Sequence, residues 1–308
     1  MRDKTFKTLD EQIEIMKSKG LTILDIDKAK SILFRENYFF LNGYRQLLMY
    51  PGEKKFIKGS TFDELYGIFI FDRRIRNIFF KYILVIENNV KSIISYFMSK
   101  KYGYKEKDYL NDENFIDDPS RIKQVHDIIS KMKRQIRING AQHRATAHYV
   151  SNYGYIPLWV LVKVLSFGIV AELYGILKDE DRRSIADIYN INSDTMIIYL
   201  SLLANFRNIC AHEDIFFDHR TGRKIPDTKY HKILDIDMNE DEYIFGKNDL
   251  FALVLIMKCM LSETEFRDLV HEISYELDVL NGKVNSVSIV EILKKIGFPI
   301  NWTDILEI

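Results

Sequence analysis

The chain has 308 residues, of which 47% are hydrophobic, and its 44 Lys and Arg residues balance its 44 Asp and Glu residues. This length allows two ordinary domains or one large domain with a sizeable core. Zero net charge argues against a protein that coats duplex nucleic acid along its whole length, although it does not exclude a local basic face. The two cysteines exclude a disulfide framework and a cysteine zinc cluster, and they fit a reducing cytoplasm.

The sequence contains no segment with the character of a membrane-directed peptide. Residues 1–12 have none of the apolar core that a signal peptide needs. The nearest approach to an apolar span, YILVIE, is short and ends at Glu87. We therefore expect a soluble cytoplasmic protein without membrane association.

The first hundred residues predict helices. Only five prolines and 14 glycines punctuate the chain, which favours long helices. Residues 8–20 read as one capped helix, and a second runs from Asp25 or Asp27 to Gly43. The longest periodic stretch runs from Thr61 to about Tyr102, with apolar residues at intervals of three and four on several sides. It predicts an unusually long central helix that is buried on several sides.

The rest of the chain predicts further helices, and no segment alternates convincingly as a strand. Two loop-like segments, 103–120 and 215–246, separate the helical regions. Between the two loops we expect a basic helix from Pro119 or Ser120, then three short helices, and then a helix from Asn192 or Ser193. The three short helices are broken at Pro157 and Gly168, and the last of them starts at about Asp179. After the second loop we expect two helices in 247–280 and a short one in 286–297. The pattern predicts an all-α fold.

Residues 205–217, NFRNICAHEDIFF, place three polar side chains at the end of an apolar helical pattern. Asn208 and His212 are four residues apart and share a helix face, so the amide can orient the imidazole. Arg207 and His212 are five apart, which is roughly 140° around an ideal helix. The two side chains diverge unless the helix loosens after Ala211 or a second chain completes the arrangement. The spacing indicates either a site shared by two chains or no site.

A guanidinium and an imidazole suit phosphate chemistry. Arginine offers a planar fork to phosphoryl oxygens, and histidine can move a proton near neutral pH. Together Arg207 and His212 could cleave RNA without a metal, through attack of the ribose 2′-hydroxyl on the adjacent phosphorus. The plainer interpretation is a pair of cations that interacts favourably with the C-terminal end of a helix dipole.

The motif and its surroundings resemble a known family. RNICAH resembles the R-x4-6-H signature of the HEPN superfamily. Four segments resemble, in the same order, the bacterial abortive-infection family of the AbiD/AbiF type, and they cover nearly all of residues 8–217. They are EQIEIMKSKGL to LNGYR, FDELYGIFIF to SKKYG, YIPLWVLVKVLSFGIVAELYGIL, and LLANFRNICAHEDIFF. Glu213 stands where this family usually has a second histidine.

The resemblance implies a HEPN-like helical bundle with one long central helix and added N- and C-terminal helices. The core would be residues 61–217, with an N-terminal helical extension, 1–60, and a C-terminal one, 218–308. It also implies a metal-independent endoribonuclease for phage defence, an effector or toxin that leaves 2′,3′-cyclic phosphate and 5′-hydroxyl ends. Arg207 and His212 would be catalytic, and Asn208 would orient the imidazole.

The same resemblance implies that two copies pair their motifs in a homodimer. We expect RNA and not DNA as the substrate, no cofactor, no metal, and an RNA or protein antitoxin as a candidate partner. The alternative is a non-catalytic HEPN module that binds RNA or a partner protein, and cleavage of RNA in the presence of EDTA would separate the two.

Segment 121–148 is rich in Lys and Arg and provides candidate RNA contacts. The candidates are Lys131, Lys133, Arg134 and Arg137. They could follow an RNA backbone, or they could form a solvated helix face balanced by the acidic segment 235–242. The sequence does not decide between these interpretations.

Other notable residues are expected to be structural. Asp72 and Arg76 form an i,i+4 pair on the long helix, and Glu87 follows on the same face; we expect structural polar groups inside the bundle, with Glu87 near the site as the lesser alternative. Trp159 and Phe167 are expected in the core, with a platform for base stacking as the lesser alternative. His143 and His148 lack the i,i+4 spacing of a helical metal pair.

Overall fold

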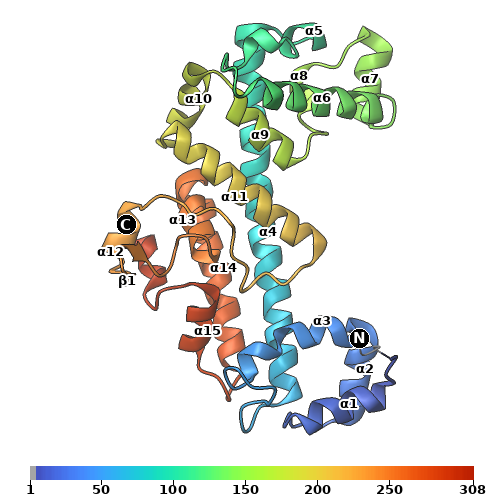
Figure 1. Ribbon diagram of the computed structural model, residues 1–308, viewed down its shortest axis with the longest axis vertical. Helices are drawn as coiled ribbons and strands as arrows, with labels where there is room; N and C mark the ends of the chain where they lie inside the picture. Colours follow the sequence, from blue (N-terminus) through green and yellow to red (C-terminus); the bar gives the residue numbers. More distant parts are fainter. Residues whose placement is uncertain (1–4) are drawn as a thin grey trace.

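A single helix of 41 residues, α4 (Phe62–Tyr102), runs along the long axis of the molecule and organises the fold (Figure 1). It starts with a capping box, in which Glu64 accepts from the Thr61 N–H at 2.7 Å and Thr61 accepts from the Glu64 N–H. It ends at Gly103, which has a φ of 97°. Buried residues occur on several sides of α4, and the predicted long central helix is confirmed.

The computed structural model describes residues 5–308. The first four residues belong to the predicted N-terminal extension and to the segment expected to lack a signal peptide, and they lie outside the described residues. Within residues 5–308, no helix is both long and apolar enough to cross a membrane. The fold is all-α, as predicted.

The N-terminal helices pack at one end of α4. They are α1 (Leu9–Ser18), α2 (Ile26–Glu36), α3 (Tyr38–Gly43) and the 3₁₀ helix η1 (Tyr44–Leu48). The single helix predicted over 25–43 is wrong, because Asn37 has a φ of 66° and separates α2 from α3. Its side chain accepts a hydrogen bond from the Phe39 N–H and so caps α3.

A second group of short helices covers the opposite end of α4 (Figure 1). They are α5 (Glu106–Tyr109), η2 (Asp112–Asn114), α6 (Ile122–Asn139), α7 (Arg144–Tyr153), α8 (Leu158–Leu161), α9 (Phe167–Ile176), α10 (Asp179–Ala186) and η3 (Asp187–Tyr189). The predicted loop at 103–120 therefore contains two short helical turns. The predicted break at Gly168 is also wrong, because the chain breaks just before, and Ser166 caps α9.

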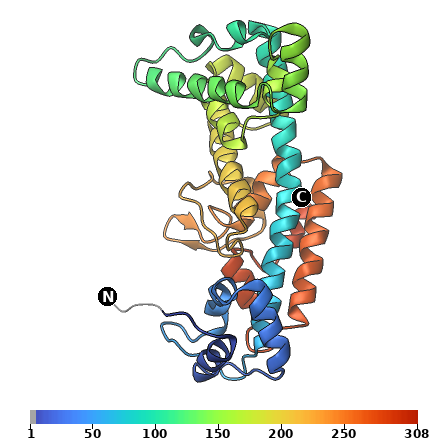
Figure 2. The same cartoon turned by 90° about the vertical axis from the view of Figure 1, so that its right-hand side faces the viewer.

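The motif helix α11 and the C-terminal elements complete the fold. They are α11 (Ser193–His212), α12 (Lys229–Ile233), β1 (Met238–Asn239), β2 (Glu242–Tyr243), α13 (Leu250–Met260), α14 (Glu263–Asn281), α15 (Ile289–Ile296) and η4 (Trp302–Leu306). Helix α4 lies between α11 and α14 in Figure 2, so both its long sides are covered. Buried apolar residues from Ile13 to Ile305 form one cluster, so the three predicted segments share a core.

Candidate functional site

Helix α11 carries the Arg-x4-His motif and remains helical up to His212. The chain then reverses at Glu213, whose φ of 56° lies in the left-handed region. The Asp214 N–H donates back to the Ile209 carbonyl at 3.3 Å and closes the helix end. Because the helix does not loosen before His212, Arg207 and His212 project in different directions within one chain.

Arg207 is held against the central helix. Its Nε lies 3.4 Å from Oε2 of Glu87 on α4, and its guanidinium lies 5.9 Å from the centre of the Phe80 ring. Glu87 is buried and also accepts from Lys91 Nζ at 2.6 Å. No hydrogen bond within residues 5–308 occupies either terminal nitrogen of Arg207. The fork of the partly exposed guanidinium is therefore free to bind an anion.

His212 and Asn208 are both exposed on the surface of α11. Across the described part of the chain, no hydrogen bond joins them, so the orienting contact predicted for Asn208 is not made in this single chain. Asn205 and Ala211 are exposed as well. The C-terminal part of α11 thus presents a small polar face that includes His212.

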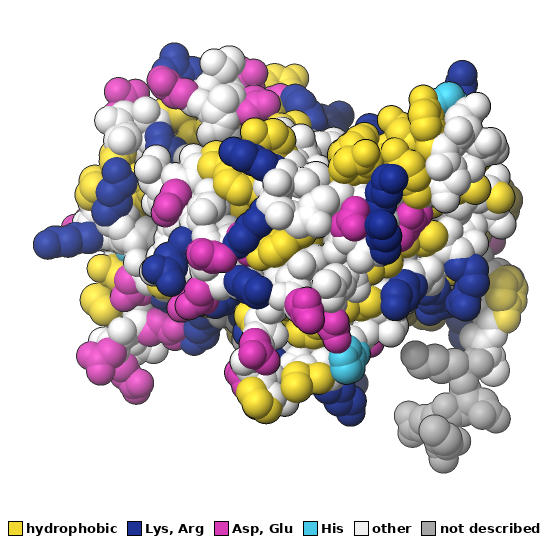
Figure 3. Space-filling view, turned by 90° about the horizontal axis from the view of Figure 1, so that it is seen from above, with side chains coloured by type: hydrophobic (Ala, Val, Ile, Leu, Met, Phe, Trp, Pro, Cys, Tyr) yellow, Lys and Arg dark blue, Asp and Glu magenta, His cyan; other side chains and the backbone are white. Residues whose placement is uncertain are grey.

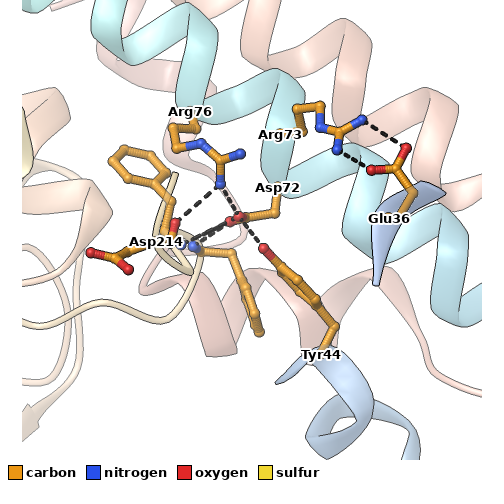
Figure 4. Close-up of polar contacts among 8 residues, drawn as sticks. Glu36, Tyr44, Asp72, Arg73, Arg76 and Asp214 are labelled. Atoms are coloured by element: carbon orange, nitrogen blue, oxygen red, sulfur yellow. Dashed lines mark hydrogen bonds and ion pairs between the residues drawn. The ribbon is translucent and has the colours of Figure 1, made fainter. Parts of the chain in front are cut away.

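Asp72 anchors the segment that follows the motif (Figure 4). Its carboxylate is fully buried and accepts from the backbone N–H groups of Phe216 at 3.1 Å and Phe217 at 2.6 Å. The Tyr44 hydroxyl donates a third hydrogen bond at 2.7 Å. Burial raises the pKa of Asp72 to about 6, although these hydrogen bonds lower it.

Arg76 pairs with Asp72 and also donates a hydrogen bond to the segment that follows the motif. Its Nη1 lies 2.8 Å from Asp72 Oδ2 and donates to the Asp214 carbonyl at 3.1 Å. Both side chains are buried within the bundle. Asp72 and Arg76 therefore fix the position of residues 214–217 against α4, and with them the end of α11.

Cys210, inside the motif, faces the core. It is buried, and burial raises the pKa of its thiol to about 12. The thiol stays protonated at neutral pH and is not an activated nucleophile. Within residues 5–308, no group of three His, Cys, Asp or Glu residues is placed to hold a metal ion.

The basic segment lies on α6, at one end of the molecule. Lys131 pairs with Asp127 at 2.9 Å and with Glu172 at 2.7 Å. The three remaining candidates make no ion pair within residues 5–308 and are exposed: Lys133, Arg134 and Arg137. The acidic segment that was expected to balance them forms the β1–β2 hairpin near the middle of the long axis, away from α6 (Figures 1 and 2). The expectation that this acidic segment balances the cations of α6 is therefore wrong.

Trp159 was predicted in the core, and this prediction is wrong. Its side chain is 45% exposed, whereas Phe167 is buried as expected. Helix α8 has a single turn that directs Leu158, Val160 and Leu161 inward and leaves Trp159 outside. The surrounding residues are all apolar in the sequence, so no periodicity marks the outward position.

These features define an all-α protein in which a long central helix supports a second helix that ends in an Arg-x4-His motif. A family model described as Abi-like protein matches residues 31–218, more than half of the chain, and the chain belongs to this family. Neither the curated proteins nor the solved structures include a match. Family membership indicates a role in abortive infection. The predicted resemblance is confirmed at this level, while the AbiD/AbiF type and the HEPN superfamily stay predictions.

Proposed function

We propose that this protein is a metal-independent endoribonuclease of the HEPN type that acts as an abortive-infection effector or toxin. The observation that carries the proposal is the guanidinium of Arg207, which Glu87 holds through Nε alone while its terminal nitrogens stay free. The exposed His212 lies at the end of the same helix. An anion-binding fork and a proton-transfer group thus share one short helical segment.

The proposed reaction needs only these two kinds of side chain. An imidazole of His212 removes the proton of the ribose 2′-hydroxyl, which attacks the adjacent phosphorus. Arg207 stabilises the charge that builds on the phosphoryl oxygens. The bond to the 5′-oxygen breaks, and this oxygen takes a proton from a protonated imidazole. The products carry a 2′,3′-cyclic phosphate and a 5′-hydroxyl, and DNA is not a substrate because it lacks the nucleophile.

A homodimer would bring Arg207 and His212 to the same phosphate, although the two side chains diverge within one chain. The exposed face of α11 includes Asn208, Ala211 and His212 and is available for contact with a second copy. We expect two copies to meet at this face, so that Arg207 of one copy serves a phosphate beside His212 of the other. Light scattering at micromolar concentration should give twice the chain mass. A monomer that cleaves at a rate linear in enzyme concentration would contradict this arrangement.

The unpaired cations of α6 should contribute to RNA binding. Reversing Lys133, Arg134 and Arg137 to Glu should weaken binding of single-stranded RNA at low salt. Each lost phosphate contact removes about 0.7 from the slope of log K against log salt, so the slope should become shallower by about two. Filter binding at several salt concentrations measures this.

The control for this experiment is an equal reversal of exposed cations on other helices, which should change the affinity far less. The control positions are Arg35, Lys232 and Lys294. If both triple variants lose the same affinity, the effect is one of net charge and α6 is not an RNA-binding surface.

The proposed function is tested by incubating the purified protein with mixed RNA in EDTA and mapping the ends of any fragments. We expect fragments with 2′,3′-cyclic phosphate and 5′-hydroxyl ends. Intact RNA under all conditions, or fragments with 5′-phosphate ends, would contradict the mechanism. The remaining explanation would then be a non-catalytic module that binds RNA or a partner protein.

A further inference from the structure

The end of the molecule opposite α1–α3 carries a cluster of exposed aromatic side chains. The most exposed are Tyr153 at 58%, Trp159 at 45% and Tyr104 at 40%. They come from α7, from α8 and from the segment that follows α4. Figure 3 looks onto this end and shows hydrophobic side chains interspersed with Lys and Arg. Large apolar groups at a surface are unfavourable in water unless something covers them.

The rings of this cluster form a continuous row. The Trp159 ring centre lies 5.4 Å from Tyr104, and Tyr104 lies 5.9 Å from Tyr155. Tyr155 lies 6.3 Å from Tyr153, which lies 5.4 Å from Tyr149. We call these five residues the aromatic row. Neighbouring rings are tilted to each other by 35° to 54°.

Two lysines and two acidic residues neighbour the aromatic row in the sequence. Lys105 Nζ lies 4.9 Å from the centre of the Tyr155 ring, and Lys163 is exposed four residues after Trp159. The two nearest acidic residues in the sequence are occupied by backbone groups. Glu106 accepts from the Ile156 N–H at 2.6 Å, and Asp108 accepts from the Lys105 N–H at 3.3 Å.

We propose that the aromatic row binds unpaired nucleotides of RNA by stacking their bases, with Lys105 and Lys163 beside the phosphates. Exposed rings interleaved with cations are the arrangement by which proteins bind single-stranded nucleic acid without reading its sequence. The identity of the nucleic acid as RNA rests on the proposed function. The row itself lies far along the long axis from the end of α11 (Figures 1 and 2), so it is a binding surface separate from Arg207 and His212.

The chemistry of the surface favours a nucleic acid over a protein partner. The row consists of tyrosines and one tryptophan, and a lysine ammonium lies over one of its rings. The exposed cations of α6, Lys133, Arg134 and Arg137, belong to the same end of the molecule (Figure 1). We expect a strand longer than the row to reach these cations with its phosphates.

The two tryptophans of the chain give a direct optical test. Trp159 is exposed in the row, whereas Trp302 is buried. The probe is a single-stranded 2′-O-methyl oligoribonucleotide of about ten nucleotides, within the site size of such surfaces. It lacks the nucleophilic 2′-hydroxyl and cannot be cleaved by the proposed mechanism. Binding should quench tryptophan emission in the wild type and in Trp302→Phe, but not in Trp159→Phe.

Affinity gives the second readout. Trp159→Ala and Tyr153→Ala should each raise the Kd for the probe, because loss of one stacked base costs roughly 5- to 150-fold. Tyr275→Ala, at an equally exposed tyrosine on α14, is the matched control and should leave the Kd unchanged. Circular dichroism verifies that all variants are folded.

Wild-type affinity in both row variants, or equal losses in Tyr275→Ala, would overturn the proposal and leave the row to a protein partner. These outcomes are independent of cleavage. If the probe quenches the emission of Trp159 but the protein never cleaves RNA, the binding role of the aromatic row is supported and the proposed endoribonuclease activity is contradicted. If the protein cleaves RNA but the row variants keep wild-type affinity, the activity is supported and the binding role of the row is contradicted.

Discussion

Replacing His212 with alanine should lower the rate of RNA cleavage by about 10²–10⁴-fold, the usual value of a positioned proton-transfer group. The variant should unfold at the same urea concentration as the wild type, because the imidazole is exposed and makes no hydrogen bond within residues 5–308. Cleavage of one single-stranded RNA in EDTA measures the rate. His271→Ala is the matched control, since His271 is also exposed but lies on α14.

Arg207 should behave differently from His212 in a substitution series. Arg207→Ala removes a donor to the transition state and should cost roughly 10²–10³-fold. Arg207→Lys keeps the positive charge but loses the planar fork, so most of the activity should still be absent. Asn208→Ala should have the smallest effect, because Asn208 makes no contact with His212 in the single chain.

Two results would contradict these roles. Full cleavage by His212→Ala would remove the proton-transfer step, and a loss of folding by Arg207→Ala would assign its pairing with Glu87 to stability. Folding must therefore be measured together with activity for each variant. Binding of the same RNA, measured beside cleavage, separates an RNA-binding module, which would bind but never cleave, from a nuclease.

The sequence predicts those parts of the fold that depend on neighbouring residues. The capping box of Thr61 and Glu64 and the helical period after it locate α4 to within one residue. Local patterns also locate the cap of α1 at Thr8, and they offer Asp25 or Asp27 for α2, whose cap is Asp25. They miss Asn37, because a left-handed backbone at one asparagine interrupts an otherwise continuous apolar pattern.

The sequence predicted the Asp72–Arg76 pair and offered Glu87 near the site as the lesser alternative. The contacts between residues that are distant in the sequence could not be predicted. Glu87 and Arg207 are 120 positions apart, and only the packing of α11 on α4 brings them together. No sequence pattern indicated the contact of Tyr44 with Asp72, because Tyr44 lies between α3 and α4 and belongs to no periodic pattern. The expected divergence of Arg207 and His212, by contrast, rests on helix geometry alone, and α11 is helical through both residues.

The largest effect on stability should come from Asp72. Asp72→Ala leaves Arg76 as a buried cation without its partner and removes the acceptor of two backbone N–H groups. Breaking a buried ion pair by removing one partner costs about 3–5 kcal/mol. Urea unfolding at neutral pH measures this loss. A change under about 1 kcal/mol would mean that the segment after the motif is held by other contacts.

Tyr44→Phe is the milder variant, for the case that Asp72→Ala does not fold. It removes one hydrogen bond to a charged group, worth roughly 1.5–3 kcal/mol, and keeps the ring. Glu36→Gln is the control from the same region, drawn beside it in Figure 4. Glu36 pairs with Arg73 at a partly exposed site, so its removal should cost no more than about 1 kcal/mol.

Because Asp72 holds residues 214–217, the variants also test whether the anchor positions His212. In Tyr44→Phe, measured well below its unfolding transition, the anchor is weakened but the fold persists. We expect cleavage to fall more than the small unfolded fraction explains, while Glu36→Gln cleaves like the wild type. If activity follows the folded fraction alone, Asp72 and Tyr44 stabilise the bundle without positioning the end of α11.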